Sequence, residues 1–477
     1  MAADWALLST EILLAALGLG LLALGLVVPR DRQRSLGYLA SVGLALVLLV
    51  TLARHGRQGV FLGGSYLQDA YAAFFKELLL SAAILATIAS HDFVPRLGRY
   101  QAEFYALVVF ATLGMVLVAG AGDLVTLYLG LELMTISFCL LAAFNQGDPK
   151  SQEAGLKYIL LGAMSSAVLL YGLSLVYGLA GTTRLGELGP ALASRTQVPL
   201  LNPAVVFLIA GFAFKIAAVP FHFWSPDVYE GAPTPVTALL AVGSKAAALA
   251  ALIRLLVMAL PEVQAYWGAP LVLLCLLTVV FANLVAIPQT NIKRLLAYSS
   301  ISQAGYLLLG AVALSPLGLT GVLFHSLLYV FANMAAFMVV TAFWQATGSD
   351  EIPDYAGLAR RAPLLAAVML FSLLSLAGIP PLAGFWGKFY LFTAAIERGY
   401  VWLALVAVIM TMVSVYYYLL VAKAMFIKEP PAGSPSLRVP IGLQVAMVAC
   451  LVVILLVGTY PGPLTQIAAD VAQTFLR

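Results

Sequence analysis

The chain has 477 residues, of which 62% are hydrophobic and 10% are charged, and its mean hydropathy is +1.00. A soluble protein is roughly 45–50% apolar and about 25% charged, so this sequence has too few polar residues to cover a globule in water. The net charge of +4 is too small to favour binding to nucleic acid. The composition therefore predicts an integral membrane protein.

About fourteen apolar stretches follow one another along the chain, separated by short turns rich in Gly, Pro, Asn and Asp. Each is long enough to cross the hydrocarbon core, which takes about 20 helical residues. They are centred near Leu17, Leu44, Ala82, Leu113, Ile136, Val168, Leu208, Ala248, Val279, Leu308, Val330, Ser375, Val408 and Val448. No polar linker divides them, so we predict one all-α, polytopic transmembrane domain over residues 1–477.

The cysteines and glycines argue against a bound cofactor. Cys139, Cys275 and Cys450 lie singly in apolar stretches, so no CxxC pair or cluster-binding spacing exists. The glycines of residues 17–25 miss the dinucleotide-binding spacing and follow no strand. We therefore expect this chain to bind no metal, Fe–S cluster or nucleotide.

Basic residues are distributed unevenly between the two sets of connections. Connections after odd-numbered stretches contain Arg30, Arg32, Arg34, Arg96, Arg99, Lys150, Lys157, Lys293, Arg294, Arg360, Arg361, Lys423, Lys428 and Arg438. Connections after even-numbered stretches contain Arg54, Arg57, Arg184, Arg195 and Arg398, and Arg477 ends the chain. Because Lys and Arg accumulate on the cytoplasmic side, the odd connections are predicted to be cytoplasmic and both termini to lie outside.

Two of the stretches, the seventh and the twelfth, carry prolines at matching intervals. Pro203 and Pro220 are 17 residues apart, as are Pro363 and Pro380. The match predicts an internal repeat, and because the two stretches are five spans apart the copies would be inverted. Proline-interrupted spans in inverted repeats are typical of transport sites near the membrane midplane. Ordinary proline kinks in long helices are the alternative.

Four charged residues lie deep within the predicted spans. Glu132 is near the middle of the fifth stretch, Lys215 precedes Pro220, Lys245 is in the middle of the eighth, and Lys388 follows the second proline-marked break. A charge at the bilayer centre costs about 2.5–3.5 kcal/mol on insertion scales, so such groups face a partner or a water-filled cavity.

These buried charges predict a proton relay. Burial lowers the pKa of a lysine and a nearby carboxylate raises it, so a lysine whose partner comes and goes can load and release a proton. The alternative is a static ion pair that fixes helix register. The surplus of lysines favours the relay, since one glutamate cannot pair with all three at once.

Two histidines are weaker candidates for the same path. His325, in the eleventh stretch, is a possible relay between Lys245 and Lys388, because imidazole titrates near neutral pH. Its alternative is an ordinary hydrogen bond within the bundle. His222 follows Pro220 and is a possible entry residue or a structural residue of the break.

The remaining polar residues of the spans are predicted to be structural. Lys76 is near a helix end and is expected to snorkel to the interface. Arg254 is expected to anchor the eighth stretch at the interface, and Glu11 to be structural. Tyr416–Tyr418 are expected to be interfacial or packing aromatics.

Three segments carry a specific family resemblance. Lys215–Lys245, Asn291–Tyr306 and Gly378–Phe392 closely resemble the antiporter-like subunits, subunit N above all, of the proton-pumping NADH:quinone oxidoreductase, bacterial respiratory complex I. The resemblance covers nearly the whole chain. It implies fourteen transmembrane helices with two inverted five-helix repeats, helices 4–8 and 9–13, in which helices 7 and 12 are broken. The corresponding segments would be 1–100 for helices 1–3, 101–260 and 265–428 for the repeats, and 436–477 for helix 14 and the tail.

The resemblance also implies roles for the buried charges. Glu132 and Lys215 would form the coupling ion pair, Lys245 would be the central relay lysine, and Lys388 would face the exit half-channel. Lysine at the last of these positions distinguishes subunit N from subunit M, which has glutamate there. The chain ends after its fourteenth stretch, without the long lateral helix of subunit L. Opening of the ion pair would pass a proton to Lys245, and then through water and His325 to Lys388.

The implied partners contain the redox chemistry. NADH, FMN, Fe–S clusters and quinone would bind other subunits of the translocase, and subunits M and K would be membrane-arm neighbours in the bacterial cell membrane. Alternatives are a subunit of a multi-subunit cation/proton antiporter, a passive scaffold that joins membrane subunits, and a related complex fed by ferredoxin in place of NADH. A quinone-reducing enzyme in its own right is disfavoured, because the chain encodes no redox centre.

Overall fold

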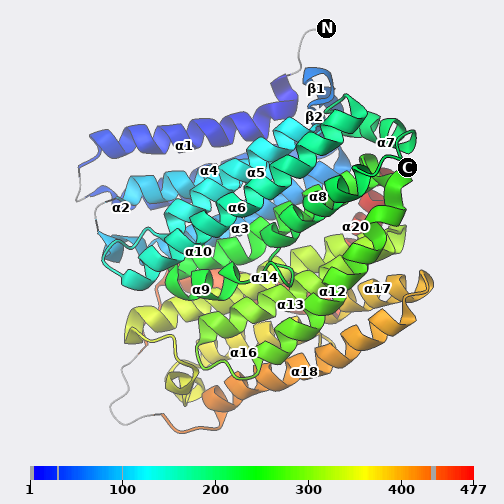
Figure 1. Ribbon diagram of the computed structural model, residues 1–477. Helices are drawn as coiled ribbons and strands as arrows, with labels where there is room; N and C mark the ends of the chain where they lie inside the picture. The colour runs from blue at the N-terminus through cyan, green and yellow to red at the C-terminus, as the bar shows by residue number, and fades with distance from the viewer. Residues whose placement is uncertain (1–4, 30–31, 99, 431–436, 477) are drawn as a thin grey trace.

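The computed structural model describes residues 5–29, 32–98, 100–430 and 437–476. The chain forms a bundle of roughly aligned helices (Figure 1). Three arginines of the orientation argument, Arg30, Arg99 and Arg477, lie outside the described residues.

Within the described ranges, twelve helical segments are long and apolar enough to cross a membrane. They are η1 (Trp5–Leu8) with α1 (Ser9–Val27), α2 (Arg34–Ala53), α3 (Ala70–Ser90), α4 (Gln101–Ala119), α5 (Leu124–Ala142), α6 (Pro149–Ala180), Thr234–Met258, η6 (Pro261–Val263) with α12 (Gln264–Ala286), α13 (Ile292–Ala313), α14 (Pro316–Thr347), α18 (Val401–Phe426) and α19 (Ile441–Thr459). The predicted all-α polytopic membrane fold is thereby confirmed.

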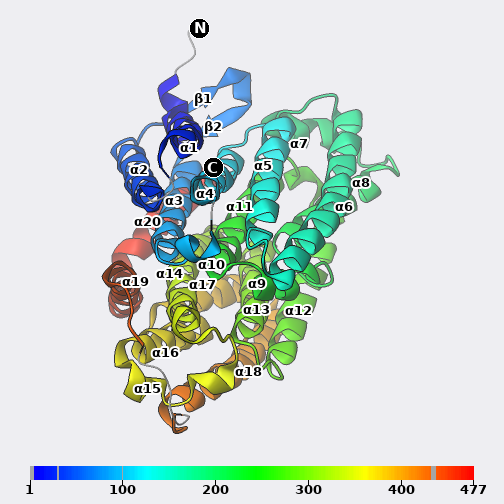
Figure 2. The ribbon, with the colours of Figure 1, turned by 90° about the vertical axis from the view of Figure 1, so that its left-hand side faces the viewer.

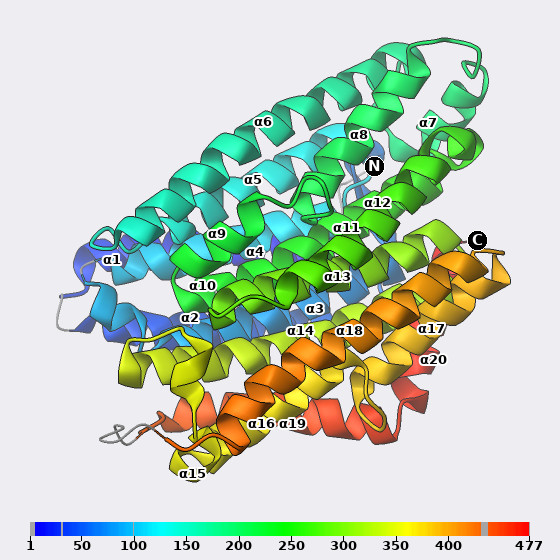
Figure 3. The same cartoon turned by 60° about the horizontal axis from the view of Figure 1, so that its bottom comes forward.

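Two shorter apolar helices stop at the proline-marked positions. The helix α8 (Leu201–Lys215) ends before Pro220, and the chain resumes as α9 (Trp224–Gly231) after a bend (Figure 3). Likewise α16 (Pro363–Ala377) is followed, after a break that contains Pro380, by α17 (Ala383–Glu397). Proline interrupts a helix because it lacks the backbone N–H and its ring collides with the preceding turn.

Side chains and neighbouring helices satisfy the backbone groups that the first break frees. The Val219 N–H donates to Thr278 Oγ1 on α12 at 3.0 Å, and Trp224 Nε1 donates to the Phe214 carbonyl at 3.0 Å. Irregular backbone within a membrane is stable only where such partners or water are present.

The central element of the bundle runs continuously from Thr234 to Met258. It comprises α10 (Thr234–Leu239), a π-helical segment η5 (Leu240–Ser244) and α11 (Lys245–Met258). This element and α13 are wholly buried, whereas α1, α2, α6, α18 and α19 are mostly exposed and form the outside. In Figure 2, α13 and α14 lie between α5, α6 and α8 on one side and α15 (Leu358–Arg361), α16 and α18 on the other.

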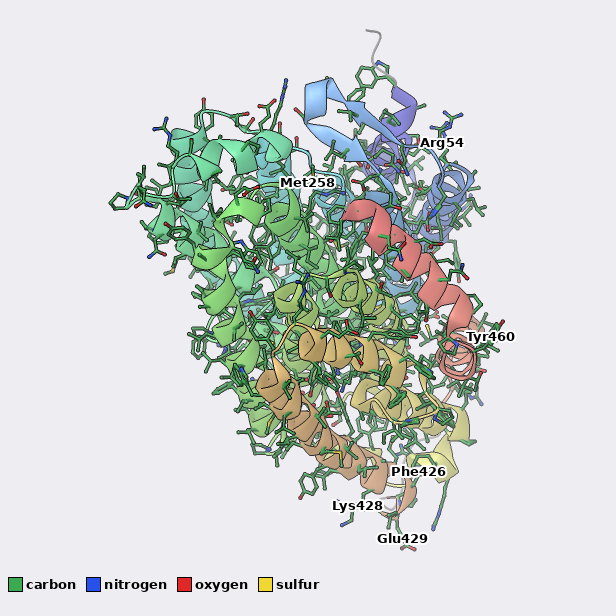
Figure 4. All side chains as sticks on the ribbon, turned by 90° about the vertical axis from the view of Figure 1, so that its right-hand side faces the viewer. Arg54, Met258, Phe426, Lys428, Glu429 and Tyr460 are labelled. Carbon is green, nitrogen blue, oxygen red and sulfur yellow. The ribbon has the colours of Figure 1, made fainter. Side chains whose placement is uncertain are left out.

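Short elements cover one end of the bundle, where both termini lie (Figure 1). The strands β1 (Gly59–Phe61) and β2 (Tyr66–Gln68) pair antiparallel around η3 (Leu62–Gly64), and α7 (Leu185–Ala193) follows α6. The C-terminal helix α20 (Gly462–Phe475) crosses this end from Tyr460 toward Met258 (Figure 4). The segments η4 (Val94–Leu97) and η7 (Ile352–Tyr355) are single 3₁₀ turns.

The structure corrects two predictions about polar residues. Lys76 does not snorkel: its side chain is 1% exposed, and its Nζ lies 2.8 Å from Glu11 Oε1. Arg254 is not an interface anchor either, because it is buried and forms two hydrogen bonds, of 2.7 and 2.9 Å, with the Asp69 carboxylate. Both side chains have carboxylate partners on segments distant in the sequence, so neither needs to reach the interface.

Candidate functional site

Glu132 and Lys215 come together between α5 and α8. Lys215 Nζ lies 3.5 Å from Glu132 Oε1, but its shorter contacts are with Thr135 Oγ1 at 2.7 Å and Ser166 Oγ at 3.1 Å. The Ser166 hydroxyl also donates to Glu132 Oε1, so it bridges the two charges. Lys215 thus has hydroxyl partners that can hold its ammonium when the carboxylate moves away.

The two members of this pair differ in burial. The Lys215 side chain is 1% exposed, whereas 23% of the Glu132 side chain is exposed on the outside of α5. Glu132 takes its cation from another helix, as expected of a charge within a span, but part of its side chain faces outward from α5. Glu132 lies in a stripe of exposed apolar residues at helical spacing: Val125, Leu129, Ile136 and Leu140.

Lys245 occupies a different environment at the start of α11. Its Nζ donates to Ser300 Oγ on α13 and lies 5.5 Å from the centre of the Tyr229 ring. Ser300 also accepts a hydrogen bond from the Tyr329 hydroxyl at 2.7 Å and lies 3.3 Å from the Tyr229 hydroxyl. No carboxylate among the described residues lies within ion-pairing distance of Lys245.

Lys388 lies at the second break, again with no ion-pairing carboxylate among the described residues. Its Nζ donates to the Ala377 carbonyl, the last residue of α16, at 3.1 Å. The ammonium also sits 4.3 Å from the centre of the Tyr306 ring. A helix end that leaves carbonyls unpaired provides such a cation site.

One side of α13 contacts three of the candidate residues in turn. Ser300 binds Lys245, Gln303 Oε1 lies 2.9 Å from His325 Nε2, and the Tyr306 ring faces Lys388. Residues three apart on a helix are neighbours on its surface, and these three span about 9 Å along the axis. The helix α13 therefore carries a polar line from Lys245 through His325 to Lys388.

The structure does not bring every candidate together. No hydrogen bond or ion pair in the described part of the chain joins Lys215 directly to Lys245, or Lys245 to Lys388. His222 is buried, and its ring packs against Phe223 and Phe281, with centroids 4.7 and 4.9 Å apart. Its ring thus packs against α12 through Phe281.

An ionic network holds α9 between α6 and α13. Asp227 accepts from Lys157 at 2.5 Å and from Arg294 at 2.8 Å, and Glu230 accepts from Lys150 at 2.8 Å and from Arg294 at 2.9 Å. The helix α9 carries Tyr229, which faces Lys245, so this network fixes the helix that follows the first break.

Sequence analysis missed the neutral residues of the site. Ser166, Thr135, Ser300, Gln303 and Tyr306 provide most of the hydrogen bonds and ring contacts of the buried cations. Ser, Gln and Tyr are common in helices, so they stand out only once the folded chain brings them beside a charge. The three-residue spacing of Ser300, Gln303 and Tyr306 was the one available signal.

Within the part of the chain that the structure describes, no three His, Cys, Asp or Glu side chains are placed to hold a metal ion. The three cysteines are buried, free thiols.

Comparisons with known proteins show the family to which the chain belongs. A family model described as NADH:quinone oxidoreductase/Mrp antiporter, TM matches residues 121–414. An NADH-quinone oxidoreductase subunit N of Moorella thermoacetica is 61% identical over 469 residues, which cover 98% of this chain and 98% of that protein. A chain of respiratory complex I from Thermus thermophilus is 38% identical, with a TM-score of 0.82 over 96% of this chain and 99% of that chain.

A chain of the Mrp complex from Dietzia sp. is 23% identical, with a TM-score of 0.89 over 99% of this chain and 98% of that one, and shows likeness of fold alone. The family model covers more than half of the chain, and the relatives match over nearly its full length, so together they establish the family. The chain belongs to the NADH:quinone oxidoreductase/Mrp antiporter transmembrane family, in which it groups with the N subunits of NADH-quinone oxidoreductases.

Proposed function

We propose that this chain is the proton-translocating subunit N of an NADH:quinone oxidoreductase and that Glu132, Lys215, Lys245, His325 and Lys388 form its proton relay. One observation carries the proposal. Lys215 has a carboxylate partner, whereas Lys245 is held by the Ser300 hydroxyl of α13 and Lys388 by the Tyr306 ring of α13 and the last carbonyl of α16. Neutral groups bind an ammonium more weakly than a carboxylate does, so Lys245 and Lys388 can release a proton to the next group.

The proposed transfer begins at the Glu132–Lys215 pair. Two unlike charges about 4 Å apart interact by about 4 kcal/mol at an effective dielectric near 20, so a small separation changes how firmly lysine holds its proton. When Glu132 moves away, Lys215 gives up a proton toward Lys245 and Ser300. The proton continues through water and His325, whose Nε2 is held by Gln303 Oε1, to Lys388 and leaves on the outer side. His222 is the proposed entry residue.

The proposed architecture has fourteen spans. The twelve long segments supply twelve of them, and the broken helices α8–α9 and α16–α17 supply the other two. The breaks belong to the seventh and twelfth spans, as two inverted five-helix repeats over 101–260 and 265–428 require, flanked by 1–100 and 436–477. In this arrangement both termini lie on the outer side of the bacterial cell membrane.

The proposed partners follow from the exposed side of α5. Glu132, whose side chain is 23% exposed amid an apolar stripe, is costly in contact with lipid, so another membrane subunit covers it. Subunits M and K are the proposed neighbours. FMN, Fe–S clusters and quinone bind elsewhere in the complex, where NADH is oxidised, and the resulting signal reaches the Glu132–Lys215 pair through the membrane arm.

Proton pumping by the assembled complex tests this function. Lys245→Met is compared with Lys423→Met, which removes an exposed lysine near the end of α18. In vesicles, with NADH or reduced ferredoxin as electron donor, we expect Lys245→Met to lose this subunit's share of pumping and Lys423→Met to keep it. Unchanged pumping by assembled Lys245→Met complex would refute the relay. Cation/proton exchange without any quinone reductase in the purified complex would support the antiporter alternative instead.

A further inference from the structure

Three adjacent tyrosines on α18 have different environments. Tyr416 is 57% exposed, whereas Tyr417 and Tyr418 are buried. The prediction that the three are interfacial or packing aromatics fits this division, since the rings of Tyr417 and Tyr418 pack in the core with centroids 4.5 Å apart. The two buried tyrosines also use their hydroxyls inside the bundle. The Tyr417 hydroxyl donates to Asn283 Oδ1 on α12 at 3.1 Å, and the Tyr418 hydroxyl lies 2.5 Å from Ser299 Oγ on α13.

A chain of hydrogen bonds leads from Tyr417 through Asn283 to Tyr306, whose ring faces Lys388. Asn283 is fully buried, and its amide is held on both sides: Oδ1 accepts from Tyr417, while Nδ2 donates to the Tyr306 hydroxyl at 3.3 Å and to the Val279 carbonyl at 2.7 Å. A buried amide with three bonds has a single orientation. Tyr417 and Asn283 thus fix the direction of the Tyr306 side chain.

The Tyr306 ring is a principal support of the Lys388 ammonium. Among the described residues, the one hydrogen-bond acceptor that the structure assigns to Lys388 is the Ala377 carbonyl, and the ring centre lies 4.3 Å from Nζ. The face of an aromatic ring attracts a cation, most strongly where water is excluded, and its orientation decides the strength. Rotation of the ring would present its edge and remove the attraction.

We propose that Tyr306 is the cation-binding partner of Lys388, and that Asn283 and Tyr417 are positioning residues that hold its ring against the ammonium. The inference rests on the proposed function, in which Lys388 carries the proton before release. In this arrangement α12 and α18, which contribute no charge to the relay, control how firmly the last lysine holds its proton.

Matched tyrosine variants of the whole complex test the inference. Tyr417→Phe removes only the hydroxyl that holds Asn283, Tyr306→Leu removes the ring, and Tyr416→Phe makes the same change as the first on the exposed neighbour. The initial rate of proton pumping is measured in vesicles at a matched rate of quinone reduction, with the amount of assembled complex measured in parallel. A purely structural role would lower assembly and leave the pumping rate per assembled complex unchanged.

We expect Tyr306→Leu to slow proton transfer about tenfold, the size that a desolvated cation–π contact supports. Tyr417→Phe should slow it roughly fivefold, as the loss of one buried hydrogen bond would. Tyr416→Phe should have no effect. In a Lys388→Met background, Tyr417→Phe should cause no further loss, because both changes act on one group.

Normal pumping by Tyr306→Leu and Tyr417→Phe, with pumping lost in Lys388→Met, would overturn the inference and leave the proposed function standing. Normal pumping by Lys388→Met would overturn the role of Lys388 itself, and the inference with it. If Tyr306→Leu fails to assemble, the pumping rate of Tyr417→Phe tests the inference, because this variant removes a hydroxyl and keeps every ring.

Discussion

Lys76 pairs with Glu11, and Lys215 pairs with Glu132; in each pair a buried lysine meets a glutamate from another helix. The first pair has its charged atoms 2.8 Å apart and is almost fully enclosed, with side chains 1% and 6% exposed. The second pair is 3.5 Å apart, and its glutamate is 23% exposed. The residue types are the same, but the separation and the surroundings are not.

The neighbours of each pair explain the difference. Lys76 also donates to Gln68 Oε1 at 2.5 Å and lies 4.9 Å from the Tyr66 ring, while the Tyr66 hydroxyl donates to Glu11. Gln68 and Tyr66 both belong to β2, and together they contact Lys76 and Glu11 in their paired arrangement. The neighbours of Lys215 are hydroxyls that can bind its ammonium whether or not Glu132 is near. We infer that the closer and more enclosed pair is static, and that the wider pair, whose lysine has two hydroxyl acceptors, can open.

The largest expected effect is on pumping. Lys215→Met should reduce this subunit's proton translocation at least about a hundredfold, since the loss of a positioned proton carrier typically costs that much. The measurement is the initial rate of proton uptake by vesicles at a matched rate of quinone reduction. A normal rate in the assembled variant would place the Lys215–Glu132 pair in the same static class as Lys76–Glu11.

The second largest effect is expected on the stability of the protein, when the Lys76–Glu11 pair is broken. Lys76→Met leaves Glu11 as an uncompensated buried charge, which typically costs about 3–5 kcal/mol. We expect less assembled complex and a lower unfolding temperature, with normal pumping per assembled complex. Loss of pumping at full assembly would show that Lys76 belongs to the proton path.

Removing both charges of a pair should sharpen the contrast. The double variant Glu11→Leu with Lys76→Leu should recover most of the stability lost in Lys76→Met, because no unpaired charge remains in the interior. The corresponding double variant of Glu132 and Lys215 should assemble but not pump. Native gels give the amount of assembly, and vesicle assays give the pumping. Pumping by the second double variant would contradict the comparison.

The smallest expected effect comes from the neutral neighbours. Ser166→Ala removes the hydroxyl that bridges Lys215 and Glu132, and should slow pumping roughly tenfold, as loss of a hydrogen bond to a charged group does. The matched change beside the static pair is Gln68→Leu, which should leave pumping unchanged and lower stability. The two variants are compared at equal amounts of assembled complex. Equal pumping by both would show that Ser166 has no role in the transfer.

Much of the fold and the identities of the charged residues could be predicted from the chain alone. The apolar lengths identify the helices, and Pro220 and Pro380 mark the breaks, because both effects are local. The partners of Lys76 and Arg254 could not be predicted, since Glu11 and Asp69 come from distant segments. For the same reason the buried hydroxyls of Tyr417 and Tyr418 could not be told from the exposed one of Tyr416.

The sequence by itself determined that this is a polytopic membrane protein and which few charges lie within it. A charge inside an apolar span is rare and costly, so it is visible without a structure. Only the tertiary structure decided which charges are firmly paired and which are held by neutral groups. That distinction depends on where Ser166, Ser300 and Tyr306 lie relative to each ammonium, and the packing of helices far apart in the chain sets those positions.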